Sequence, residues 1–277
     1  MIVAVASGKG GTGKTTVAVA LAQSLPKAFL IDADVEEPNV HVFLRPRIEK
    51  KEAVYRMVPG VEGEKCSFCG KCKEICRFNA ISVFQQVILI FPEMCHGCYG
   101  CVEVCPEGCL HPGQRLVGFL YTGQGKGVRM AYGALEVGEP MPSPLIKSLK
   151  KNFLKIEKHT IIDCPPGASC PVLESMKGVD FCLLVTEPTP FGLHDLKQVY
   201  GAVKALGIPA GVIINRAGES YEPLYRFLEE ENLSLLLEIP HRREIAEGYA
   251  RGKTLLEIDP AFGETFRTLW TRINSMK

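Results

Sequence analysis

Short apolar runs alternate with longer amphipathic stretches along most of this chain. The runs are as long as strands and show no polar alternation, which is typical of strands buried on both faces of a parallel sheet. A helical stretch from about Val17 to Leu25 follows the first run. The pattern predicts an α/β protein with a mostly parallel sheet flanked by helices. The predicted strands are 2–6, 29–34, 160–163, 181–185, 211–214 and 235–239.

The last predicted helix has one apolar face, formed by Phe262, Phe266, Leu269, Trp270 and Ile273. Such a stripe ordinarily packs against a core, and a membrane-targeting tail is the alternative. No apolar run approaches the length of a bilayer span. The 277 residues are 46% hydrophobic with a net charge of +1, which indicates a substantial core and gives no sign of a nucleic-acid surface.

A glycine-rich segment lies between the first predicted strand and the first helix. The context of strand, glycine loop and helix is the one that a phosphate-binding P-loop requires. Backbone N–H groups can then surround phosphate oxygens at the positive end of the helix. Lys14 is expected to bind the β and γ phosphates of ATP and Thr15 to bind Mg²⁺. The alternative is that the segment is only a glycine-rich surface turn. The segment comprises Gly8, Lys9, Gly10, Gly11, Thr12, Gly13, Lys14, Thr15 and Thr16.

Two runs of four cysteines interrupt the α/β pattern between residues 65 and 106, and the second repeats the spacing of the first at an offset of 29 positions. The spacing C-x2-C-x2-C-x3-C resembles that of bacterial ferredoxins. Disulfides and paired zinc sites are the alternatives. Disulfides need an oxidising compartment, and no signal peptide follows Met1, so we expect a cytoplasmic protein.

The ferredoxin resemblance implies two [4Fe–4S] clusters whose ligands cross between the two runs. In that pattern the fourth cysteine of each run binds the other cluster. Arg77 departs from the pattern, because ferredoxins usually have a proline there, as this chain has at Pro106. The implied ligands are Cys66, Cys69, Cys72 and Cys105 for the first cluster and Cys76, Cys95, Cys98 and Cys101 for the second.

Two further cysteines are interpreted as small buried side chains. Cys109 follows Ala80 by 29 residues and so takes the place of a small residue in the internal repeat. Cys182 lies within the apolar run 181–185. Free cysteine packs like a small apolar residue.

The form K-G-G-x-G-K-T at residues 9–15 resembles the deviant P-loop of the ATPases that include MinD, the partition ATPases and the nitrogenase iron protein. In those relatives the early lysine, here Lys9, reaches the nucleotide of the partner subunit. It acts there much as an arginine finger does. The resemblance therefore implies an ATP-dependent homodimer and catalytic roles for Lys9, Lys14 and Asp34.

Other segments match the same family residue by residue. Asp34 corresponds to the aspartate that orients the attacking water, and Thr15, Asp34 and Asp163 are the implied Mg²⁺ site. Gly167 would sense the γ phosphate. The resemblance also implies that Asn215, Arg216 and Pro240, with His241 beside it, close the adenine pocket.

Cys170 lies seven residues after Asp163, the interval at which the nitrogenase iron protein has a ligand to a cluster shared between subunits. The resemblance therefore implies a possible further [4Fe–4S] cluster bridging the dimer. No other cysteine matches that protein's second ligand, and either Cys164 or a non-protein ligand is the candidate to replace it. The alternative is that Cys164 and Cys170 are ordinary residues of a switch loop.

Together these signatures predict two domains. Residues 1–61 and 112–277 form the P-loop ATPase, and residues 62–111 form an inserted α+β ferredoxin-like domain. The glycine- and proline-rich stretch 111–145 is expected to contain a hairpin. We expect an iron–sulfur ATPase that couples dimer rearrangement to electron transfer to, or maturation of, a partner metalloenzyme. Two alternatives remain: an assembly ATPase that delivers clusters to client proteins, and a redox-sensing positioning ATPase.

Overall fold

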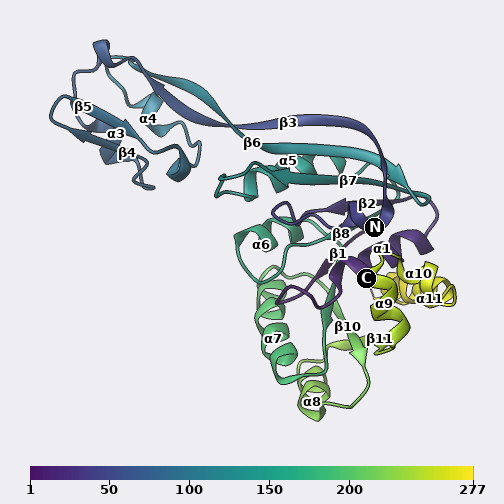
Figure 1. Ribbon diagram of the computed structural model, residues 1–277. Helices are drawn as coiled ribbons and strands as arrows, with labels where there is room; N and C mark the ends of the chain where they lie inside the picture. The colour runs from purple at the N-terminus through teal and green to yellow at the C-terminus, as the bar shows by residue number, and fades with distance from the viewer. Residues whose placement is uncertain (277) are drawn as a thin grey trace.

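The computed structural model describes residues 1–276, and its centre is a nine-stranded sheet (Figure 1). Seven strands are parallel, in the order β11-β10-β9-β1-β8-β2-β7. All six predicted strands are present, which confirms the mostly parallel sheet. The seven parallel strands are β1 (Ile2–Ala6), β2 (Ala28–Asp32), β7 (Val128–Leu135), β8 (His159–Asp163), β9 (Phe181–Thr186), β10 (Ala210–Ala217) and β11 (Ser234–Pro240).

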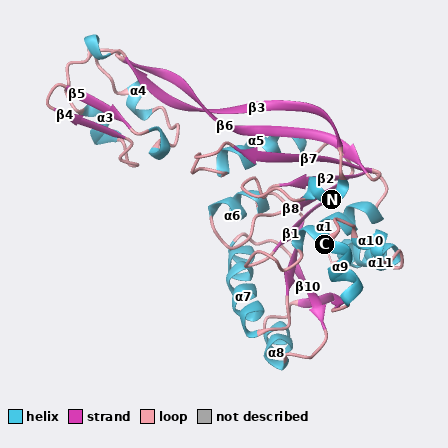
Figure 2. Cartoon of the chain, in the orientation of Figure 1, coloured by secondary structure: helices cyan, strands magenta, loops and turns pink. Residues whose placement is uncertain are grey.

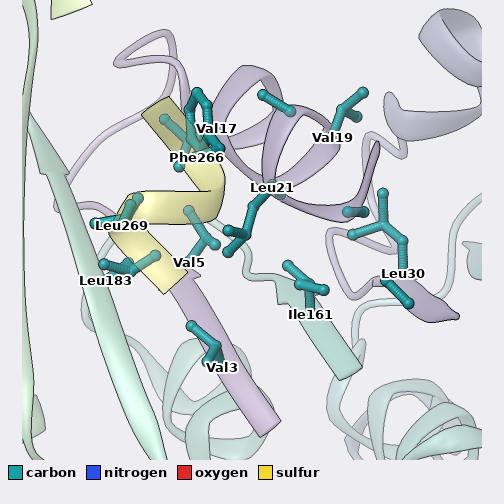
Figure 3. Packing of buried hydrophobic residues seen from close by; sticks show 14 of the residues in the cluster. Val3, Val5, Val17, Val19, Leu21, Leu30, Ile161, Leu183, Phe266 and Leu269 are labelled. Carbon is teal, nitrogen blue, oxygen red and sulfur yellow. The ribbon is translucent and has the colours of Figure 1, made fainter. Parts of the chain in front are cut away.

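Helices cover both faces of this sheet because successive residues of each strand point to opposite sides. Val3 and Val5 of β1 belong to the core under α1 and α11, whereas Ala4 and Ala6 belong to the core under α5, α6 and α7. Figure 3 shows the first of these cores. The helices around the sheet are α1 (Lys14–Ser24), α2 (Val40–Leu44), α5 (Ser143–Phe153), α6 (Cys170–Met176), α7 (Pro190–Ala205), α8 (Glu222–Glu230), α9 (Arg243–Ala250), α10 (Leu255–Ile258) and α11 (Phe262–Ser275).

Helix α11 packs on the core with its apolar face. Phe266 and Ile273 are fully buried in the cluster that also contains Val17 and Leu21 of α1. The packing interpretation of this helix is confirmed, and its apolar stripe is not free to enter a membrane. None of the helices within residues 1–276 is both long and apolar enough to cross a bilayer.

Two long antiparallel strands extend the sheet and project beyond it as an arm (Figure 1). They are β3 (Arg47–Val61) and β6 (Leu110–Gly125), and β6 also pairs with β7 through the hairpin expected between residues 111 and 145. The sequence did not predict β3. Its first half, from Arg47 to Glu52, is rich in charged residues and exposed, so it lacks the apolar run of a buried strand.

The segment between β3 and β6, here called the cysteine module (residues 62–109), forms a small unit at the end of the arm (Figures 1 and 2). Its backbone repeats at the same offset of 29 residues as its cysteines: left-handed residues at Phe68, Gly70 and Asn79 recur at Gly97, Tyr99 and Gly108. The two halves therefore share one local fold. The elements are η1 (Gly63–Lys65), α3 (Lys71–Ile75), β4 (Ile81–Phe84), β5 (Val87–Ile90), η2 (Pro92–Met94) and α4 (Gly100–Glu103).

Candidate functional site

The loop between β1 and α1 has the geometry of an anion site. Helix α1 begins at Lys14 and has no side-chain cap, so its first N–H groups are available to a ligand. Gly13 has a φ of 97°, and a Cβ there would lie 2.3 Å from Nδ2 of Asn215. Glycine is therefore required at this position. Gly8 serves packing instead, because a Cβ there would strike the backbone of Asp195 in α7.

The carboxyl ends of β2 and β8 bring acidic groups to this loop. Thr15 Oγ1 donates a hydrogen bond of 2.6 Å to Oδ2 of Asp163, whose Oδ1 is buried and has no hydrogen-bond partner within residues 1–276. Burial raises the pKa of Asp163 to about 7 and that of Asp34 to about 6. Mg²⁺ requires oxygen ligands. The unsatisfied Oδ1 of Asp163, the hydroxyl of Thr15 and the carboxylate of Asp34 are oxygen ligands of that kind. The site thus has the donor set for a magnesium ion.

Asp32 is a functional residue that the sequence interpretation missed. Its carboxylate accepts hydrogen bonds from the backbone N–H groups of Asp34, Asn39 and Val40. Burial, and then the charge of Asp163, raise the pKa of Asp32 well above its ordinary value. These bonds fix the loop that presents Asp34. The signal was available in the sequence, because an aspartate at a strand end often binds the amides of the following turn.

A cavity of about 340 Å³ adjoins the loop. It contains Lys14, Thr15 and Asp34 together with the predicted residues Asn215, Arg216, Pro240 and His241, so the structure brings both ends of the predicted nucleotide site together. Asn215 Nδ2 donates to the carbonyl of Thr12 at 2.8 Å. The sequence missed the far wall of the cavity, which comes from α9 and α10: Ile245, Ala246, Tyr249, Leu255 and Ile258.

The predicted residues Lys9 and Gly167 are among those that do not line the cavity. Lys9 is partly exposed, and its Nζ is 3.9 Å from Glu187, which also pairs with Arg216. Gly167 donates its N–H to the carbonyl of Ser7 and has a φ of 95°. Within its own chain, Lys9 is thus held beside Glu187 and outside the cavity.

Two small cavities in the cysteine module divide the eight cysteines between them. Each cavity takes three cysteines from one run and the fourth from the other, the crossed sets expected from the spacing. Backbone N–H groups of Phe68 and Gly97 point at the sulfurs of Cys66 and Cys95, both at 3.4 Å. The first cavity is lined by Cys66, Cys69, Cys72 and Cys105, and the second by Cys76, Cys95, Cys98 and Cys101.

The remaining cysteines differ in their surroundings. Cys109 is buried, as expected, but it also lines the first cavity, with its Sγ 3.4 Å from that of Cys105. Cys182 is fully buried beside Met176, which confirms its packing role. Cys164 is fully buried too, and burial raises its pKa to about 12. Cys170 is exposed at the start of α6, so only Cys170 of this pair is accessible to a second subunit.

Comparisons with known proteins agree with this geometry. The profile of the CobQ/CobB/MinD/ParA nucleotide binding domain matches residues 3–255. An uncharacterised protein of Methanocaldococcus jannaschii is 33% identical over 223 residues, which is 79% of each chain. Ferredoxin-1 of Chlorobaculum tepidum is 38% identical over 56 residues, 18% of this chain and 90% of the ferredoxin. The cell division ATPase MinD of Pyrococcus furiosus superposes with a TM-score of 0.60 at 21% identity, covering 100% of this chain and 99% of MinD.

Proposed function

The chain belongs to the CobQ/CobB/MinD/ParA family of nucleotide-binding proteins, and from this premise we propose that it is an iron–sulfur ATPase. In this proposal MgATP closes a homodimer, and the closure is coupled to electron transfer to, or maturation of, a partner metalloenzyme. The observation that supports it best is one chain with both a P-loop cavity and two smaller cavities that divide the eight motif cysteines into crossed sets of four.

In this proposal each polar group of the nucleotide site has a role. Lys14 binds the phosphates, while Thr15 and Asp163 hold the Mg²⁺ that neutralises charge on them. Asp34 orients the attacking water, and Lys9 of the partner subunit stabilises the charge that develops during transfer. The adenine lies between Asn215 and the wall formed by α9 and α10. Hydrolysis is slow until the dimer closes, because the site is complete only then.

The cysteine module is proposed to be an inserted ferredoxin-like domain with two [4Fe–4S] clusters, which supply one-electron chemistry when bound. Within residues 1–276 no three His, Cys, Asp or Glu side chains converge tightly enough to hold a single metal ion. A cubane does not need such convergence, because each thiolate binds a different iron. The alignment with a ferredoxin over 56 residues supports the cluster assignment over zinc.

The test is an anaerobic redox titration followed by electron paramagnetic resonance, first with MgADP and then with a non-hydrolysable MgATP analogue. We expect the analogue to shift the potential of at least one cluster, because potential depends on nearby charge, hydrogen bonds and solvent exposure. Lys14→Ala, which should not bind nucleotide, is the control and should show no shift. Equal potentials in the two nucleotide states of the unmodified chain would contradict electron gating and favour cluster delivery or redox sensing.

A further inference from the structure

A buried ionic cluster connects the arm to the nucleotide-binding domain. Arg56 of β3 and Arg115 of β6 stand directly opposite each other in the strand ladder. Two like charges in that position repel, and Glu139, from the loop between β7 and α5, lies against both. The side chains of Arg56 and Glu139 are only 6% and 1% exposed, and that of Arg115 is 28% exposed. The three residues are here called the latch.

The carboxylate of Glu139 is shared between the two arginines. Its Oε1 and Oε2 accept from Nε and Nη2 of Arg56 at 3.2 and 3.3 Å, and Oε2 also accepts from Nε of Arg115 at 2.8 Å. Glu139 therefore neutralises a cross-strand repulsion inside the protein. A buried carboxylate that joins two arginines fixes geometry strongly, because the guanidinium fork allows few alternative arrangements.

The other donors of the arginines hold the cysteine module. Arg56 donates through Nη1 to the carbonyl of Cys95 and through Nη2 to that of Pro92 at 2.7 Å. Arg115 donates to Glu93 at 2.8 Å. The same loop packs closely on β3, since a Cβ on Gly97 would lie 3.1 Å from the carbonyl of Met57. The loop that begins the second cysteine set is thus bound to the latch, whereas within residues 1–276 neither arginine side chain hydrogen-bonds to the loop of the first set.

The latch is also linked through the backbone to the loop that presents Asp34. The N–H of Leu135, four residues before Glu139, donates to the carbonyl of Val35 at 2.8 Å, and Val35 follows Asp34 directly. The next residue, Glu136, donates to Val117 of β6. A continuous set of backbone and ionic contacts therefore connects Asp34, in the nucleotide cavity, with the carbonyl of Cys95.

We infer that Glu139, Arg56 and Arg115 dock the cysteine module on the nucleotide-binding domain and transmit the state of Asp34 to the loop that holds Cys95. The inference rests on the proposed iron–sulfur function and specifies which cluster responds. The cluster of Cys76, Cys95, Cys98 and Cys101 is the one that senses nucleotide. The cluster of the first set lies farther along the arm, beside Leu110, where β6 begins.

The test uses hydrogen exchange on the full-length, cluster-loaded chain with MgADP and with the MgATP analogue. Glu139→Gln keeps the shape of the side chain and removes its charge. We expect it to raise exchange at residues 92–98 at least tenfold and to abolish any difference there between the two nucleotides. Glu157→Gln is the matched control, because Glu157 pairs with Arg129 near the surface of the same domain, and it should leave the loop unchanged. Loop exchange equal to that of the unmodified chain would overturn the inference.

A second variant keeps the inference testable if Glu139→Gln folds poorly. Arg56→Lys keeps the positive charge but loses the fork, so the loop should exchange faster although the module stays folded. Arg56→Gln removes the charge beside the second cluster, so the potential of that cluster should fall relative to the first. An unchanged separation of the two potentials would contradict the assignment. A third outcome separates the two ideas. If hydrogen exchange of the loop responds to the variants as expected but the cluster potentials do not change with nucleotide, the proposed function is contradicted and the inference about the latch stands.

Discussion

At the residue scale, the nucleotide site is built from carboxylates that the fold holds in an unfavourable state. Asp32 and Asp163 are both buried, and burial raises the pKa of each. The charge of Asp163 raises the pKa of Asp32 further, and Oδ1 of Asp163 has no hydrogen-bond partner within residues 1–276. The proposed function accounts for this cost, because a bound Mg²⁺ would supply positive charge and a ligand contact for this oxygen. Removing a buried charge from a site of this kind raises the stability of the protein and lowers its activity.

Asp163→Asn should therefore stabilise the nucleotide-free and metal-free chain. The pKa of Asp163 is about 7 in the folded chain and 3.8 ordinarily. The native state therefore binds this proton more tightly than the unfolded chain does, and it loses stability as the pH rises from 3.8 to about 7. Asparagine removes this loss and still accepts from Thr15. We expect a thermal midpoint higher by about 2–4 °C at pH 8, with the gain shrinking toward pH 4. The exposed Glu219→Gln should show no gain, and a lower midpoint for Asp163→Asn at pH 8 would contradict this account.

Cys170 tests whether the dimer holds an additional cluster. Its thiol is exposed at the start of α6, whereas Cys164 is buried and cannot serve as the second ligand in this conformation. If two Cys170 thiolates bridge a cluster, Cys170→Ala should lower the iron content by one four-iron cluster per dimer. The neighbouring Ser169→Ala is the control. Unchanged iron and unchanged electron paramagnetic resonance spectra would establish Cys170 as an ordinary residue of the switch loop.

At the element scale, the predictable parts are those in which one local pattern determines the structure. Six of the seven parallel strands were recognisable as apolar runs, and the P-loop followed from its context. Strand β7 was expected only as part of a hairpin within residues 111–145. Strand β3 was not predictable, because exposed lysines and glutamates of its first half pair with β6 only in the folded chain. The far wall of the nucleotide cavity was missed for a related reason: Tyr249 and Leu255 lie in the separate helices α9 and α10, which only the folded chain brings to the P-loop.

The apolar stripe of helix α11 is explained by its packing on the core. Phe266→Ala removes a fully buried ring from the core against α1, so the free energy of unfolding should fall by about 3–5 kcal/mol. Thr268→Ala, on the exposed side of the helix, should have little effect. Denaturant unfolding of both variants measures the difference. Unchanged stability of Phe266→Ala, with loss of binding to lipid vesicles, would restore the membrane-tail alternative.

At the scale of the whole molecule, the two candidate sites lie at two different edges of the sheet. The carboxyl ends of its central strands form the nucleotide site, and its antiparallel edge extends into the arm that holds the cysteine module (Figure 1). The ionic latch joins them, and its charged residues could not be singled out in the sequence, because isolated arginines and glutamates are ordinarily solvated. A change at one edge therefore has a rigid route to the other.

The role of Lys9 can be decided by mixing two inactive chains. Lys9→Ala and Asp34→Asn should each bind nucleotide and each lose hydrolysis. If Lys9 acts on the partner's nucleotide, a mixed dimer contains one complete site, made of Asp34 from the Lys9→Ala chain and Lys9 from the other. An equal mixture should then recover about one quarter of the unmodified rate, since half of the dimers are mixed and each has one working site. A lysine that acts within its own chain gives no recovery. Lys9 is partly exposed beside Glu187, so a reach to the partner would require it to leave this ion pair, and phosphate release measured on the mixture distinguishes the two arrangements.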